Sequence, residues 1–486
     1  MEEEIGIETV KARSVRGIVV LTGRTFFLQV ISFLAQLLLF AYLDVSDFGV
    51  FAIVSAVVNF LTYFSDIGLA AALIQKREAP ELKDYRTTFT VQQFLVLLLV
   101  SVLFIFSDRI VNYYSLDSNS LFLIYALGIS LILTSLKSIP SVMLERKLEF
   151  TKLVLPQIIE QLVYNIVLVV LAINGFGILS FTYAVLIRSI VGLLLIYYIQ
   201  PWKIGLAFSV ETLKGLFKFG IPYQLNTLLA TIKDDGMMIV LGGILGPAGM
   251  GILSFSQKVA RYPLTFFMDT VTKVTFPAFS RLQDDKKDLE RSVTRSIFFI
   301  CLLVFPSLVG LVLLIPIITE VIPRYEKWSV AIIPLTFISI NYAFAAGTTQ
   351  LTNLLNAIGK IKITFYLMIM WTALTWLLVP YLSSKFGVNG ASLGYALVGL
   401  SSVVAIAIAK RYVNFSISDS IAKPLFGSLI MGITVMIARK YLPYTLNSLY
   451  ILVLIGVISY GVSMITMIGM SLLEDAKKSF KTIFNR

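Results

Sequence analysis

Two cations stand one helical turn apart in one of the most apolar regions of this sequence. The stretch SFSQKVARYP, residues 254–263, carries Lys258 and Arg261 with no acid beside them. Polar residues recur around them every three or four positions, which places their side chains on one face of a helix; this polar stripe consists of Ser254, Lys258, Arg261, Thr265, Asp269 and Thr272. Lysine and arginine are the side chains that bind phosphate and carboxylate groups. The stripe therefore predicts either an anion site facing a wet cavity or ion pairs with acids on neighbouring helices.

Seven cations in all lie within predicted membrane spans, where an ionisable group costs several kcal/mol unless it meets water or a partner; they are Arg24, Lys137, Arg188, Lys233, Lys258, Arg261 and Lys273. Arg188 stands ten residues into its span without a local acid, which favours a place in a cavity. Arg24 lies beside the polar series Thr25, Gln29, Ser32 and Gln36, and either lines the cavity or reaches back to the inner interface. Lys137 lies near the inner end of its span, where snorkelling is the expected explanation.

Acids within the spans are fewer. Asp234 and Asp235, in TIKDDG, either neutralise Lys233 or bind a coupling ion, and Asp269 on the polar stripe is a third candidate for ion coupling. Asp234 and Asp235, together with Glu160, are also the acids with which Lys258 and Arg261 could pair.

The composition sets limits on the chemistry. The 486 residues are 57% hydrophobic and 14% charged, with a mean hydropathy of +0.87, which predicts an integral membrane protein. Histidine is absent, which excludes a Ser-His catalytic site and the usual zinc ligands. The single cysteine, Cys301, excludes an internal disulfide. No phosphate-binding P-loop motif occurs, so we expect no cofactor and no ATP hydrolysis, and transport energy must come from a gradient.

Apolar segments of spanning length recur with short gaps. They predict an all-α membrane protein of about fourteen helices, at residues 17–43, 47–74, 87–107, 119–141, 152–173, 178–200, 213–241, 247–277, 292–318, 328–356, 362–382, 389–409, 421–440 and 448–473.

The distribution of positive charge predicts the topology. With the N-terminus inside, inside segments hold 27 of the 40 Lys and Arg residues and outside loops hold only 6. The positive-inside rule therefore places both termini in the cytoplasm. Because topology accounts for most of the net charge of +12, a nucleic-acid partner is not needed.

An internal repeat divides the chain. YLDVSDFGVFA (42–52) and ILGPAGMGILS (244–254) both predict tight outside turns, and an offset of 202 superposes Gly49 on Gly251. A weaker echo relates GFGILSFTYAVLI to KFGVNGASLGYALV. The repeat predicts two six-helix lobes in the same orientation. The predicted organisation is an N-terminal lobe at 1–200, an amphipathic cytoplasmic linker at 201–220, a C-terminal lobe at 221–412, and two further helices with a basic tail at 413–486.

Several stretches resemble the polysaccharide-transporter family, the Wzx-like flippases of lipid-linked oligosaccharides in the multidrug/oligosaccharidyl-lipid/polysaccharide (MOP) superfamily. The resemblance extends over essentially the whole chain, and its main stretches are DFGVFAIVSAVVNFLTYFSDIGLAAALIQKRE (47–78), ERKLEFTKLVLPQIIE (145–160), DDGMMIVLGGILGPAGMGILSFSQKVARYP (234–263) and VTFPAFSRLQDD (274–285).

The resemblance implies a MATE-like fold that alternates between inward-open and outward-open states. It implies a polyprenyl-diphosphate-linked glycan as substrate, moved between the leaflets of the cell inner membrane, and a cationic cavity formed here by Arg24, Arg188, Lys258, Arg261 and Lys273. Gln29 and Gln224 on the same helices supply amide partners for sugars. Partners expected with it are the bilayer, a coupling Na⁺ or H⁺ and polysaccharide polymerase or assembly proteins, with the chain itself a monomer.

Two alternatives stay open on the sequence alone. A multidrug exporter of the same superfamily would be expected to have twelve helices and an acidic cavity. A membrane-embedded glycan polymerase or ligase would need a large outside loop or a pair of catalytic acids. Neither feature is predicted here, so we expect a transporter and not an enzyme.

Overall fold

The computed structural model describes the backbone of residues 7–469. It describes side chains from residue 20 onward, apart from residues 22, 223, 225, 226, 269, 270, 273 and 274. Every regular element in this described part is a helix, which confirms the predicted all-α fold. Contacts divide the chain into two compact units, Met1–Gly251 (unit 1) and Ile252–Arg486 (unit 2).

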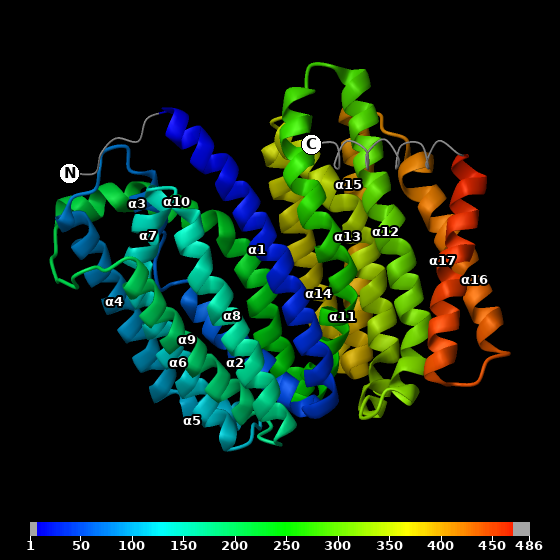
Figure 1. The fold of residues 1–486 in the computed structure, drawn as a ribbon, viewed down its shortest axis with the longest axis horizontal. Helices are drawn as coiled ribbons and strands as arrows, with labels where there is room; N and C mark the ends of the chain where they lie inside the picture. The colour runs from blue at the N-terminus through cyan, green and yellow to red at the C-terminus, as the bar shows by residue number, and fades with distance from the viewer. Residues whose placement is uncertain (1–6, 470–486) are drawn as a thin grey trace. The chain divides into compact units, whose positions relative to one another are not determined.

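Unit 1 begins with a long helix and ends inside another (blue to green in Figure 1). Its elements are α1 (Ile7–Tyr42), α2 (Val45–Thr62), α3 (Leu69–Gln75), α4 (Leu82–Ile105), α5 (Ser107–Tyr113), α6 (Asn119–Leu136), α7 (Ser138–Arg146), α8 (Phe150–Ile173), α9 (Leu179–Ile199), α10 (Val210–Thr231), the π-helix η1 (Ile232–Gly236) and the start of α11 (Met237–Arg281).

Unit 2 continues α11 and ends in a helical hairpin (green to red in Figure 1). Its further elements are α12 (Lys286–Val321), η2 (Glu326–Ala331), α13 (Ile332–Ala357), α14 (Ile361–Leu400), α15 (Val403–Tyr412), the π-helix η3 (Ser418–Ala422), α16 (Lys423–Arg439) and α17 (Leu446–Ile468). Apolar contacts join this hairpin to α12, where Ile317 packs with Met431 and Leu452. The Tyr460 hydroxyl also donates to the carbonyl of Leu302, at 2.8 Å.

The described residues contain 12 apolar helical segments long enough to cross a membrane. Two of them, Thr227–Met268 and Ile361–Tyr412, have 42 and 52 residues, enough for two crossings each. Each is interrupted by a glycine with positive φ, Gly246 at 64° and Gly387 at 58°. These glycines stand at the predicted outside turns, and division there gives about fourteen crossings, as expected.

The second predicted span, 47–74, is not one helix. α2 ends at Thr62, and α3 begins only at Leu69. Ile67 and Gly68 between them have φ of 49° and 74°, a left-handed conformation that cannot continue an α-helix. A hydropathy window covers this break because the residues on both sides are apolar.

The predicted linker at 201–220 has two parts in the structure. Residues 201–209 are not helical, and α10 begins at Val210, where the Ser209 hydroxyl accepts from the Thr212 N–H. Trp202 is 9% exposed and packs against Phe89, with ring centroids 4.9 Å apart. The linker is therefore fixed to α4, and α10 runs across the end of the unit 1 bundle (Figure 1).

The two turns of the sequence repeat contact each other reciprocally. A Cβ added to Gly49 would overlap the carbonyl of Pro247, and a Cβ added to Gly251 would overlap the carbonyl of Val45. The offset of 202 residues carries Gly49 onto Gly251 and Val45 onto Pro247, so it exchanges one pair with the other. A contact in which each segment uses the same positions is what a two-fold relation produces, so the geometry supports the repeat found in the sequence.

Candidate functional site

Three charged side chains from separate segments of unit 1 meet, two of them largely buried and the third partly exposed. Both carboxylate oxygens of Glu160, on α8, accept from the Lys137 ammonium at 3.0 Å. The Arg188 Nε, on α9, lies 3.9 Å from Glu160 Oε2. We call Lys137, Glu160 and Arg188 the cationic cluster, because two positive charges share one negative charge.

The cationic cluster lies at one depth in the unit. Leu144, Leu153 and Ile196 pack together and mark a common end of α7, α8 and α9. At 1.5 Å per residue, the three charged residues stand about 14–16 Å from the ends of their helices on that side, roughly half the thickness of a hydrocarbon layer.

Local structure explains how each member reaches this place. Lys137 occupies the break between α6 and α7, where it follows Leu136, the last residue of α6, and precedes Ser138, the first of α7. Glu160 fits against the backbone of α9 because residue 192 is glycine, and an added Cβ there would overlap the carboxylate. The site thus depends on a helix break and on one missing side chain.

Two neighbours contact the Arg188 guanidinium, Glu160 near Nε and the Tyr164 ring against its planar face. Its guanidinium carbon lies 5.4 Å from the centre of the Tyr164 ring, which is one turn beyond Glu160 on α8. Its side chain is 43% exposed, against 15% for Lys137 and 10% for Glu160. Among the described residues, the two terminal nitrogens of Arg188 have no hydrogen-bond acceptor. That pair of nitrogens is the fork that binds phosphate in bidentate fashion.

One sequence expectation about this cluster is wrong. Lys137 does not snorkel to an interface, because it pairs with Glu160. Arg188 has no acid near it in the sequence, as expected, but Glu160, 28 positions away on another helix, lies beside it in the fold. Glu160 and Tyr164 were not predicted as part of a site with Arg188.

The polar series of α1 faces α8. Arg24 donates to the side-chain oxygen of Gln157, and the Ser32 hydroxyl accepts from Gln161 Nε2 at 3.2 Å. Residues 157 and 161 stand one turn apart, so α8 carries a second polar face beside the one that holds the cluster. Gln29 is half-buried in the same series. Arg24 is thus engaged with a neutral amide, and its charge has no acid among the described side chains.

Asp234 and Asp235 both have partners within unit 1. The Lys233 ammonium pairs with Asp234, and Asp235 is hydrogen-bonded to Asn59 on α2. These residues form η1, a π-helix, which is the kind of irregular turn that often marks functional positions. Gln224, one helix earlier, donates to the carbonyl of Tyr63 at 2.6 Å.

The stripe that carries Lys258 and Arg261 lies on α11 in unit 2. Lys258 is half-buried and Arg261 is exposed. No described residue lies within ion-pair or hydrogen-bond distance of the Arg261 guanidinium. The Ser254 hydroxyl, at the start of the stripe, is buried without a described partner. The side chains of Asp269 and Lys273 lie outside the described residues.

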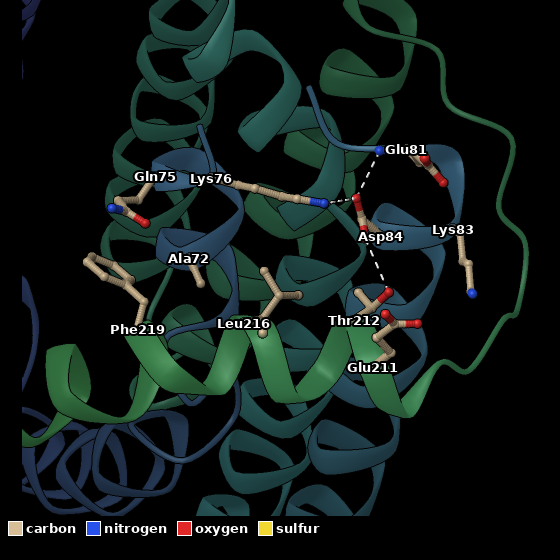
Figure 2. A pocket seen from close by; sticks show the side chains of 11 residues that line it. Ala72, Gln75, Lys76, Glu81, Lys83, Asp84, Glu211, Thr212, Leu216 and Phe219 are labelled. Atoms are coloured by element: carbon tan, nitrogen blue, oxygen red, sulfur yellow. Dashed lines mark hydrogen bonds and ion pairs between the residues drawn. The ribbon is translucent and has the colours of Figure 1, made fainter. Parts of the chain in front are cut away.

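A separate pocket of about 400 Å³ opens where α3, α4 and α10 meet (Figure 2). Asp84, on α4, accepts from Lys76 at 2.6 Å and from the Thr212 hydroxyl at 3.3 Å, and its carboxylate also accepts the Glu81 backbone N–H. Asp84 therefore links α3, α4 and α10 through one side chain.

Arg146, at the end of α7, fixes the same region from the other side. It donates to the carbonyls of Leu73, Ile74 and Lys76, at 2.6, 3.1 and 3.0 Å. These carbonyls lack helical partners because α3 ends at Gln75. The arginine thus caps α3 from a neighbouring helix.

A chain whose described part is wholly helical, with spans long enough to cross a bilayer, is a multi-pass membrane protein. A family model described as polysaccharide biosynthesis protein matches residues 38–332, more than half of the sequence, and the chain belongs to that family.

Comparisons with individual proteins agree with this assignment. The chain is 23% identical over 407 residues to the succinoglycan biosynthesis transport protein ExoT of Rhizobium meliloti (strain 1021), covering 81% of this chain and 80% of that protein. It is also 23% identical over 370 residues to the lipopolysaccharide biosynthesis protein WzxC of Escherichia coli (strain K12), covering 74% and 73%. The fold resembles the lipid II flippase MurJ in an inward closed conformation, with a TM-score of 0.76 and 18% identity over 93% of this chain and 98% of that one.

Proposed function

We propose that this protein is a flippase that moves a polyprenyl-diphosphate-linked oligosaccharide from the inner to the outer leaflet of the cytoplasmic membrane by alternating access. The oligosaccharide would be a repeat unit of an O-antigen, capsule or exopolysaccharide. Family membership supports the substrate class, since the relatives ExoT and WzxC are named for succinoglycan and lipopolysaccharide biosynthesis. The observation that carries the proposal is the excess of positive charge at mid-depth in unit 1.

The physical reason is the cost of moving a diphosphate through hydrocarbon. Its negative charges must keep strong hydrogen-bond donors throughout the crossing. Arginine supplies such donors in a planar fork and stays protonated at any physiological pH. Arg188 in unit 1 and Arg261 in unit 2 both present guanidinium groups with terminal nitrogens that no described residue occupies, and Arg24, Lys258 and Lys273 are the further cations that we assign to substrate binding.

The remaining assignments belong to the same proposal. Gln29 and Gln224 would bind sugar groups, and Asp234, Asp235 and Asp269 would serve coupling to Na⁺ or H⁺. The protein would act as a monomer in the inner membrane, with both termini cytoplasmic, alongside polymerase or assembly proteins, and would carry out no catalysis. In this proposal the transporter consists of the two predicted lobes, the linker at 201–220 that joins them, and two extra helices after residue 412.

Loss of the cations on α11 tests the function directly. In cells that depend on this protein for surface polysaccharide, Arg261→Ala with Lys258→Ala should reduce delivery of lipid-linked glycan to the outer leaflet at unchanged protein level. Arg109→Ala is a matched control, because that arginine lies over the Phe106 ring outside the candidate spans. Full translocation by the double variant would reject the proposed cation site.

Coupling is tested in proteoliposomes. If Asp234 and Asp235 bind a coupling ion, imposed sodium, proton or voltage gradients should change the transport rate, and Asp235→Asn should abolish that response. A rate indifferent to all three gradients would reject the ion role of both residues while leaving the flippase function in place.

A further inference from the structure

The charge balance of the cationic cluster raises a question that substrate binding alone does not answer. A site built only to hold a diphosphate would keep both positive charges available. Here Glu160 occupies Lys137 with both carboxylate oxygens and lies 3.9 Å from the Arg188 Nε. The cluster therefore carries one net positive charge in place of two, and the acid stands directly behind the arginine that is open to a ligand.

Glu160 acts on an anion bound at Arg188 in two opposite ways. Its charge attracts the Nε side of the guanidinium, 3.9 Å away, and with the Tyr164 ring against the guanidinium face it favours an orientation in which the terminal nitrogens point away from the carboxylate. Its negative charge also repels any anion that those nitrogens bind. In a site partly shielded from water, one unit charge a few ångströms away changes a binding constant by about tenfold or more. Repulsion of that size matters for a transporter, which must release what it binds.

We propose that Glu160 is a positioning residue that holds the fork of Arg188 outward and weakens diphosphate binding there, so that the substrate is released after crossing. This inference rests on the proposed flippase function and goes further by assigning a residue that sets the affinity. A transporter that binds its cargo too tightly in one state gains affinity and loses turnover, as an enzyme does when it stabilises its ground state.

The surroundings of Glu160 fit a built feature. Gly192 on α9 leaves the room in which the carboxylate lies. Tyr164 stands four residues after Glu160, so both side chains project from one face of α8 towards Arg188. This acid is placed between two cations, Lys137 at the break after α6 and Arg188 on α9.

Binding of farnesyl diphosphate to the full-length protein in detergent tests the proposal through a series of charge variants. Wild type has a net charge of +1 in the cluster, Glu160→Gln has +2, Lys137→Met has 0, and the double variant Lys137→Met with Glu160→Gln returns to +1. We expect Glu160→Gln to bind about tenfold more tightly than wild type. Lys137→Met should bind more weakly, and the double variant should return towards wild type.

A translocation assay with the lipid-linked glycan separates affinity from turnover. Glu160→Gln should lower the half-saturating substrate concentration and also lower the maximal rate. A purely structural role for Glu160 predicts instead less folded protein, with weaker or unchanged binding in every variant.

The outcomes distinguish this inference from the proposed function. If Arg188→Ala binds farnesyl diphosphate as tightly as wild type does, the unit 1 site is rejected and this inference with it. If Arg188→Ala weakens binding but Glu160→Gln does not tighten it, only the role of Glu160 is rejected. Should Glu160→Gln fail to fold, the comparison of Lys137→Met with the double variant decides, because equal affinity of those two overturns the proposal.

Discussion

Substitution of Gly251 by alanine should destabilise unit 1 measurably. The added Cβ would fall on the backbone carbonyl of Val45 and within 3.0 Å of its Cγ1. A backbone carbonyl cannot rotate aside as a side chain can, so α2 or α11 must shift. Overpacking of this kind costs about 1–3 kcal/mol, and the absence of a movable neighbour places this case towards about 3 kcal/mol.

The assay is thermal unfolding of the full-length protein in detergent. For a unit of this size, each kcal/mol lowers Tm by about 2–4 °C, so we expect a fall of about 6–12 °C. Gly215→Ala in α10 is the matched control, because a Cβ there meets nothing within 4 Å and alanine favours helix by up to about 1 kcal/mol. If the two variants unfold at the same temperature, the close contact of the repeated turns does not contribute to stability.

Three further outcomes are expected. Burial raises the pKa of the Asp66 carboxyl, which lies outside the candidate spans, from 3.8 to about 6. The folded protein therefore holds that proton more tightly than the unfolded chain, so stability should fall as pH rises from about 4 to about 6, and Asp66→Asn should flatten Tm over that range. Arg146→Ala should expose the end of α3 to faster hydrogen exchange, since it removes the donor on which the three carbonyls depend; unchanged exchange would argue against the cap. Asp84→Ala should lower the free energy of unfolding of unit 1 by about 2 kcal/mol. The loss is smaller than for a fully buried pair because Lys76 is 30% exposed. The substitution should also speed proteolysis near Thr212, and a cleavage rate equal to that of wild type would contradict the link to α10.

Most of the architecture could be predicted because hydropathy and charge report directly on membrane crossing. The turns at Gly246 and Gly387 carried a local signal, since glycine adopts positive φ without strain. The break between α2 and α3 did not, because Ile67 takes a left-handed conformation that its residue type disfavours. Only the tertiary setting, which the sequence does not display, holds it there.

The candidate site was predicted in part. The cations were found because each one in a span needs an explanation, and the Arg188 side chain is 43% exposed. Glu160 was considered only as a partner for Lys258 and Arg261. Its pairing with Lys137 could not be read from the sequence, because it depends on the break after Leu136 and on how α8 is rotated against α9. Such rotations follow from side-chain packing, which a single sequence does not reveal.

The order of the cluster along the chain has a consequence for how the protein is made. Lys137 and Glu160 are 23 residues apart, on neighbouring spans, so they leave the ribosome within a few seconds of each other at about 5–20 residues per second. They can enter the bilayer as a pair, which spares each span the cost of a lone charge in hydrocarbon. Arg188 follows on the next span and meets an acid that is already engaged. During biogenesis Arg188 would thus be inserted last, and its terminal nitrogens would stay available for a ligand.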